Sequence, residues 1–109
     1  MPRTDAVLKR LVALKRQAAE QSVLALQQRV REAEAALGEA VARLDATDSE
    51  HLDFTLRKLA HQQGHVRKVL ADIDAQRRVV EDSRTHLGDA EDALRRALHA
   101  EDRLNGRGS

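Results

Sequence analysis

The sequence predicts an all-α fold, an antiparallel two-helix coiled-coil hairpin with a longer C-terminal helix. Its strongest pattern is an apolar residue at every seventh position from Leu52 to Leu94. The only proline is Pro2, so no proline interrupts a helix between Thr4 and Arg103. Of the 109 residues, 34% are charged, 41% are hydrophobic and 1% are aromatic, a composition typical of long helices and not of a compact globule. We therefore expect one coiled-coil domain over residues 1–109.

The first helix is expected over about residues 5–45, with Thr4 or Asp5 as its cap. Apolar residues with alternating spacings of three and four form a coiled-coil seam along it. The seam residues are Val23, Leu26, Val30, Ala33, Leu37, Ala40 and Leu44. A second row with the same spacing lies upstream and one residue out of phase, and we expect a nearly straight helix to absorb the slip. The upstream row consists of Val7, Leu11, Leu14 and Ala18.

The hairpin turn is predicted at about residues 46–48. The surrounding segment 45–50 is polar, and Thr47 followed three residues later by Glu50 matches a capping box that starts a new helix. One alternative stays open at this point, a single unbroken helix that pairs with a second copy in a parallel dimer.

The second helix is expected over about residues 49–104, followed by a frayed tail at 105–109. The heptad ladder on it consists of Leu52, Leu59, Val66, Ile73, Val80, Leu87 and Leu94. The companion heptad position, four residues after each rung, is apolar at its ends and polar in its middle. Its residues are Leu56, Gln63, Leu70, Arg77, Arg84, Glu91 and Leu98. At a rise of 1.5 Å per residue the second helix outruns the first, about 85 Å against 60 Å, so its last turns should overhang with an unpaired apolar face.

Charge and composition favour proteins as partners. The net charge of +1 comes from 19 basic and 18 acidic residues scattered along the chain, which argues against nucleic acid as a partner. No apolar run approaches the roughly 18 residues of a membrane span, so we expect no stable membrane insertion. The start of the chain also lacks an uninterrupted signal-peptide core, and the sequence holds no cysteine. These features together predict a cytoplasmic protein.

Titratable residues do not form an enzyme-like pattern. His61 and His65, four residues apart, could present two imidazoles to one metal ion. The chain has no cysteine, however, and no glutamate lies between them, so solvated histidines are the favoured interpretation. Asp72, Asp74 and Glu81 fall in a solvated helical pattern without a pocket to shift their pKa values. We therefore expect no catalytic residue, no metal site and no cofactor.

Two basic pairs, Lys9-Arg10 and Lys15-Arg16, stand near the start of the first helix, where the helix dipole disfavours positive charge. One interpretation is an acidic partner surface at the open end of the hairpin. Another is a charged face that merely flanks an apolar stripe. A third is attachment to a membrane surface through the neighbouring apolar residues.

Two segments of the chain share the layout of a known family. Residues 8–37, LKRLVALKRQAAEQSVLALQQRVREAEAAL, begin with leucines that lead into the Leu14-Lys15 pair and continue as an alanine-rich heptad helix. Residues 92–104, DALRRALHAEDRL, belong to a longer second helix that is rich in arginine and alanine. In both segments the chain resembles the FliJ/YscO family of type III secretion proteins. The resemblance implies a non-enzymatic stalk that couples a hexameric export ATPase to the export gate. It would reach the inner membrane only through its partners.

The resemblance also implies two groups of binding residues. At the ATPase end these are Leu8, Leu11, Leu14, Lys15, Leu94 and Leu98. Nearer the turn, a surface for the cytoplasmic domain of the export gate and for export chaperones would contain Phe54, His61 and His65.

The competing hypothesis is a generic oligomeric coiled-coil adaptor or a prefoldin-like holding chaperone. In that case the apolar overhang would associate with a second copy or shield client proteins. The sequence leaves open which of these applies, whether the chain forms a homo-oligomer, and which secretion system a stalk would serve.

Overall fold

A computed structural model describes the chain as two helices, α1 from Pro2 to Ser49 and α2 from Leu56 to Arg107. Side chains are described for residues 3–46 and 61–106. The proline lies in the first turn of α1, where its missing N–H costs no helical hydrogen bond. The remaining residues of both helices are dominated by alanine, leucine, arginine and acidic residues, which favour helix.

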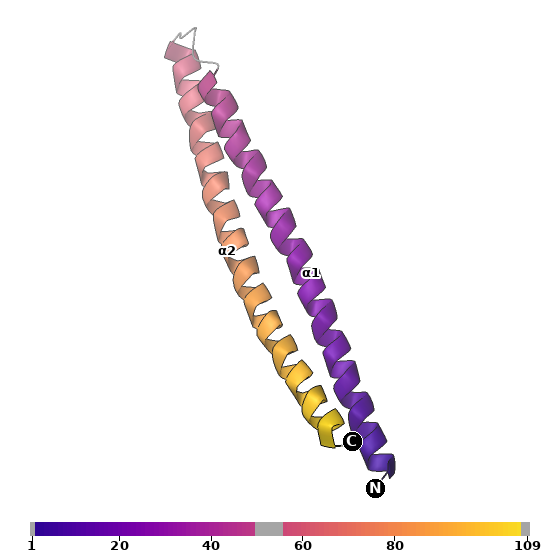
Figure 1. Ribbon diagram of the computed structural model, residues 1–109. Helices are drawn as coiled ribbons and strands as arrows, with labels where there is room; N and C mark the ends of the chain where they lie inside the picture. Colours follow the sequence, from indigo (N-terminus) through magenta and orange to yellow (C-terminus); the bar gives the residue numbers. More distant parts are fainter. Residues whose placement is uncertain (1, 50–55, 108–109) are drawn as a thin grey trace. The chain divides into compact units, whose positions relative to one another are not determined.

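The chain divides into two compact units. Unit 1 comprises residues 1–29 and 84–109, and unit 2 comprises residues 30–83. In each unit a segment of α1 runs antiparallel to a segment of α2 (Figure 1). The predicted all-α, antiparallel two-helix hairpin is therefore confirmed, and the alternative of one unbroken helix does not apply.

The helix ends differ from the predicted ones. The segment 46–48, where we expected the turn, is helical and belongs to α1, and α2 begins at Leu56 instead of residue 49. The polar residues in this segment include neither proline nor glycine, so helix can continue through them at a cost of a few tenths of a kcal/mol each. Of the expected capping box, Glu50 lies outside the described residues. At its other end α2 continues to Arg107, into the tail that we expected to fray.

The predicted overhang of α2 is wrong. The two helices contain 48 and 52 residues, so they are nearly equal in length. In unit 1, Leu8 and Val12 of α1 line an open pocket together with Ala100 and Leu104 of α2. The last turns of α2 are thus paired with the first turns of α1, because α1 starts earlier and ends later than expected.

The seam of α1 is confirmed from Val23 onward. Of the seven predicted residues, four are buried and the other three are half-buried. Upstream, however, the same heptad frame continues without a slip through half-buried side chains. These are Lys9, Val12, Arg16 and Ala19. The expectation that the row Val7, Leu11, Leu14 and Ala18 carries the seam is wrong, since all four are exposed. The helix keeps its phase and leaves this apolar row on another face.

The ladder of α2 is confirmed for the described rungs. Ile73 and Val80 are buried, and Val66, Leu87 and Leu94 are half-buried. The side chains of Leu52 and Leu59 lie outside the described set.

The companion position on α2 was wrongly assigned. It follows each rung by three residues, not four. Its buried or half-buried residues are Gln62, Val69, Gln76, Ser83, Ala90, Ala97 and Leu104. Every described residue of the predicted set is exposed, namely Gln63, Leu70, Arg77, Arg84, Glu91 and Leu98. Small side chains at three of the observed positions allow close approach of the helices, whereas the predicted set would have brought two arginines and a glutamate into the seam.

The apolar core of unit 2 forms around Ala40, which is 0% exposed. Val69 and Ile73 of α2 pack there, with Leu37 and Leu44 of α1 partly buried against them. Alanine at the centre leaves room for the larger β-branched side chains from the opposite helix. No described helix contains an apolar stretch long enough to cross a membrane.

Glycines inside the helices offer a test of how far helix propensity limits stability. A methyl group added at Gly38, Gly64 or Gly88 would meet no atom within 4 Å. We expect each Gly→Ala change to raise the free energy of unfolding by about 0.5–1 kcal/mol, because alanine loses less backbone entropy. Urea unfolding measures this. Gly106→Ala, next to the end of α2 at Arg107, serves as the control and should change little.

Candidate partner-binding surface

The exposed apolar row of α1 is the most distinctive surface of unit 1. We call Val7, Leu11, Leu14 and Ala18 the outer row. Val7 is 57% exposed, and Leu11 and Leu14 are each 52% exposed. The neighbouring Leu8 is 46% exposed. Burying these side chains against a partner would remove a continuous apolar stripe from water, which is the driving force that most protein association uses.

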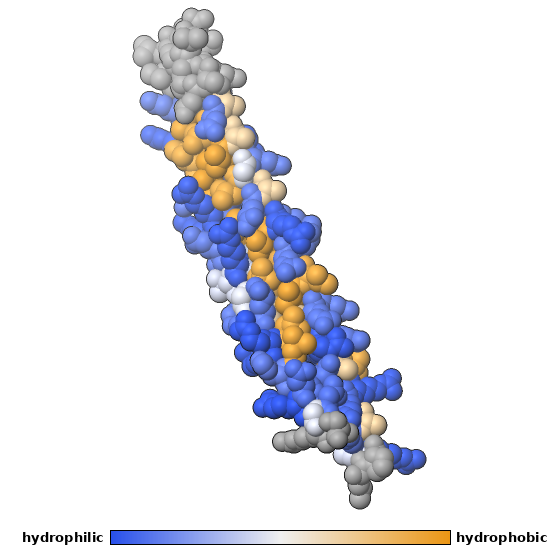
Figure 2. Space-filling view, viewed as in Figure 1, coloured by the Kyte–Doolittle hydropathy of each residue, from blue (hydrophilic) through white to orange (hydrophobic). Residues whose placement is uncertain are grey.

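The outer row borders an open groove on α1. The groove is lined by Leu8, Leu11, Val12, Leu14, Lys15 and Ala18. Leu8, Leu11, Leu14 and Lys15 are four of the six residues that the family resemblance implies for the ATPase end. These four residues lie together along the groove of α1, and their role in binding stays a prediction. On the face of the molecule drawn in Figure 2, apolar atoms lie in patches bordered by hydrophilic side chains.

The remaining two residues of the predicted ATPase end, Leu94 and Leu98, differ in their exposure to solvent. Leu98 is 43% exposed and can take part in binding. Leu94 is half-buried as a rung of the seam. Its side chain therefore packs within unit 1 and is not fully presented to a partner.

Basic side chains flank the outer row. Arg10 lies on one side of it and Lys15 on the other, and both are exposed. Neither of them makes an ion pair with another residue that the structure describes. By contrast, Lys9 is paired with Asp5 at 3.5 Å. The surface beside the row is thus left with positive charge.

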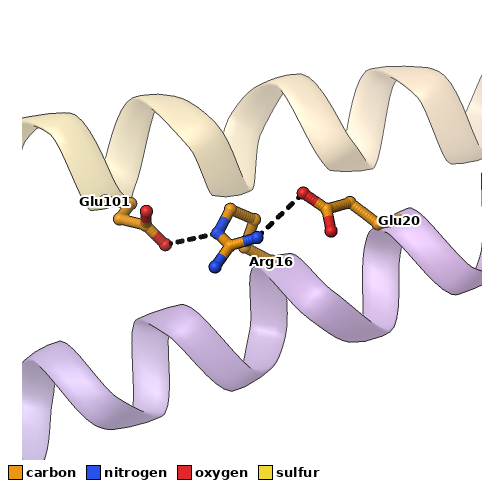
Figure 3. Close-up of polar contacts among 3 residues, drawn as sticks. All are labelled: Arg16, Glu20 and Glu101. Carbon is orange, nitrogen blue, oxygen red and sulfur yellow. Dashed lines mark hydrogen bonds and ion pairs between the residues drawn. The ribbon is translucent and has the colours of Figure 1, made fainter.

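An ionic cluster joins the two helices of unit 1 within the seam (Figure 3). Nε of Arg16 donates to Oε2 of Glu101 on α2 at 2.8 Å, and Nη1 of Arg16 donates to Oε1 of Glu20 at 2.9 Å. The side chains of Arg16 and Glu101 are each 25% exposed. The apolar pattern of the sequence did not predict this contact. The available signal was that Arg16 lies seven residues before Val23, and Glu101 seven after Leu94, with opposite charges.

The pKa of Arg16 is raised above its ordinary value. The causes are, first, its hydrogen bond to Glu101, then the bond to Glu20, and the charges of both carboxylates. A raised pKa on a cation stabilises the fold at every pH below the ordinary pKa. That stabilisation is lost as the pH rises through the raised pKa, in strong alkali. The Arg16 contribution should therefore be constant through neutral and mildly acidic pH.

We expect Glu101→Gln to lower the thermal midpoint of unfolding, because the half-buried guanidinium of Arg16 then loses its charged partner on α2. Glu20→Gln should have a smaller effect, since Glu20 lies on the same helix and its side chain is 44% exposed. Replacing both Arg16 and Glu101 by leucine should restore the midpoint. Thermal unfolding followed by circular dichroism compares the variants, and an unchanged midpoint in Glu101→Gln would show that the pair contributes nothing.

The predicted turn-proximal group is only partly described. Phe54 lies outside the described residues, and His61 and His65 are exposed. His65 lines a shallow open pocket of unit 2 with Arg43, Lys68 and Asp72, where Arg43 is paired with Asp72. Within residues 3–46 and 61–106, no three His, Asp or Glu side chains are grouped as ligands for a metal ion.

Comparison of the chain with protein-family models, with curated proteins and with solved structures finds no match.

Proposed function

We propose that the chain is a non-enzymatic, protein-binding helical hairpin that serves as a stalk of a type III export apparatus. It would couple a hexameric export ATPase to the cytoplasmic domain of the export gate and to export chaperones. One observation carries this proposal. The apolar residues that the family resemblance implies for ATPase binding, Leu8, Leu11 and Leu14, are exposed on α1 and do not belong to the seam. A helix that exposes several leucines to solvent in this way has a surface suited to binding a partner protein.

The position of this surface also supports a stalk. Leu98 of α2 is exposed in the same unit as the outer row, so both helices contribute apolar side chains at the end that carries the chain termini (Figure 1). A ring-shaped partner that contacts this end would meet apolar and basic side chains together. The histidines 61 and 65, exposed in unit 2, are available to the second group of partners.

The test is a binding and activity assay with the full chain. Purified chain is added to a hexameric export ATPase from the organism that encodes it, and ATP hydrolysis and co-elution are measured. We expect co-elution and faster hydrolysis. Absence of both, at concentrations where the chain is helical, would contradict the proposal.

A generic oligomeric adaptor or holding chaperone is the second candidate. Apolar side chains exposed away from the outer row favour it, namely Leu24, Leu70 and Val79. Such a protein would form a stable oligomer or bind unfolded clients through these side chains. Mass measurement in solution separates the candidates, because a concentration-independent tetramer favours the adaptor and an elongated monomer favours the stalk.

A further inference from the structure

The N-terminal part of α1 carries two apolar rows, of which α2 covers one. The covered row follows the seam through Val12, Ala19 and Val23, and the other is the outer row. At 100° per residue the centres of the two rows lie about 140° apart around the helix axis. The α2 segment that packs on the seam therefore leaves the outer row free for another partner.

The spacing of the outer row has the geometry of a coiled-coil stripe. From Val7 the steps to Leu11, Leu14 and Ala18 are four, three and four residues. This alternation is the pattern that receives the side chains of a second helix as knobs in holes. The stripe is about 16 Å long, or three helical turns, and Leu8 widens it on one side.

The charges beside the stripe indicate what kind of helix fits it. Arg10 and Lys15 correspond to the flanking positions of a coiled coil, which set the choice of partner through their charge. The only acidic residue between 3 and 18 is Asp5, and it is engaged by Lys9. A second copy of the chain docked through the same stripe would bring basic flanks against basic flanks, which is repulsive.

We propose that the outer row of α1 binds an amphipathic α-helix of a partner protein, whose apolar residues are spaced by three and four and whose flanking positions are Asp or Glu. The partner helix lies along α1 as a third strand, with its carboxylates facing Arg10 and Lys15. This inference rests on the proposed protein-binding function and adds the chemistry of the partner.

A protein helix fits this surface better than a lipid surface does. The four residues of the outer row span about 60° around α1, which is narrower than the apolar face of a helix that lies in a bilayer interface. The row also contains no aromatic side chain, whereas interfacial helices commonly use Trp or Phe as anchors.

Two designed helical peptides of about three heptads test the inference, one with glutamate and one with lysine at the flanking positions. Their binding to the full chain is measured by fluorescence anisotropy at low and high salt. We expect the glutamate peptide to bind about tenfold more tightly than the lysine peptide, and high salt to reduce the difference. Arg10→Glu with Lys15→Glu should invert the preference. The matched control, Arg67→Glu with Arg77→Glu, makes the same charge change at exposed sites of unit 2 and should keep it.

Several results would overturn the inference. Equal affinity for both peptides would show that the surface does not select a partner helix with acidic flanking residues. A preference for the glutamate peptide that persists after the charge reversal at Arg10 and Lys15 would show the same. Dimerisation of the chain that is lost in Leu11→Asp with Leu14→Asp would identify a second copy as the occupant. Binding to phosphatidylserine vesicles without peptide binding would identify a lipid surface. None of these assays contains the export ATPase. The inference about the partner helix can therefore fail while the chain still stimulates the ATPase, and the chain can fail to stimulate the ATPase while it still binds the acidic peptide.

Discussion

If the chain is the proposed stalk, the double variant Leu11→Asp with Leu14→Asp is expected to lose binding to the export ATPase and to stop stimulating ATP hydrolysis, with unchanged helical content. Each leucine is 52% exposed, so neither holds α1 against α2. At the centre of an interface, an apolar anchor of this size contributes about 2 kcal/mol or more. Two losses of that size weaken binding by about a thousandfold, before the cost of burying two carboxylates is added.

The matched control for this double variant is Leu24→Asp. Leu24 is on the same helix and in the same unit, is 64% exposed, and does not line the groove of the outer row. We expect this variant to bind and stimulate like the wild type. If the double variant stimulates normally as well, the outer row is not the ATPase-binding surface and the proposed function loses its main support.

Ile73→Ala is expected to lower the free energy of unfolding by about 2–4 kcal/mol. Ile73 is 6% exposed and packs with Ala40 and Val69 in the core of unit 2. A two-helix chain has few such core residues, and the total stability of a small domain is only about 5–15 kcal/mol. The midpoint of thermal unfolding should therefore fall by more than about 10 °C. Calorimetry or circular dichroism measures the change.

Leu70→Ala is a close control, because it removes the same number of carbon atoms three residues away. Leu70 is 49% exposed, so its truncation should alter stability by no more than about 0.5 kcal/mol. An equal loss in the two variants would mean that Leu70 lies in the seam. That outcome would restore the companion position that the sequence pattern predicted.

The seam rungs could be predicted from the sequence because they repeat without exception. From Val66 to Leu94 every seventh residue is a large aliphatic side chain, and a helix places such residues on one stripe. The companion stripe could not be predicted in this way. At 69 and 70 the chain offers valine and leucine side by side, so hydrophobicity does not choose between spacings of three and four. Packing between the helices decides between the two spacings. It favours the spacing of three, which places the small residues Ser83, Ala90 and Ala97 in the seam.

The position of the turn could not be predicted from the sequence pattern either. Four of the residues 45–49 are polar with modest helix propensity, and the fifth, Ala46, favours helix. The cost of keeping this segment helical is therefore small beside the packing of two long helices. For the candidate site, the family resemblance implied Leu8, Leu11 and Leu14, and their role in binding stays a prediction. Their exposure could not be predicted, since it depends on the phase of the seam. In the observed seam, Arg16 occupies one of the seam positions of α1. Because Arg16 is charged, the pattern of apolar residues does not reveal that position.

The contact between Arg16 and Glu101 restricts how the two helices of unit 1 can be aligned. An antiparallel pair with heptad repeats can slide by seven residues and still match apolar stripe to apolar stripe. Such a slide would move Arg16 from Glu101 to the neighbourhood of Leu94, and Glu101 would face a different residue of α1. Arg16 would then face leucine without a carboxylate on α2, whereas Glu101 would face Lys9, the seam residue seven positions before Arg16. The contact of Arg16 with Glu101 thereby favours the observed alignment in a seam whose apolar residues would tolerate more than one.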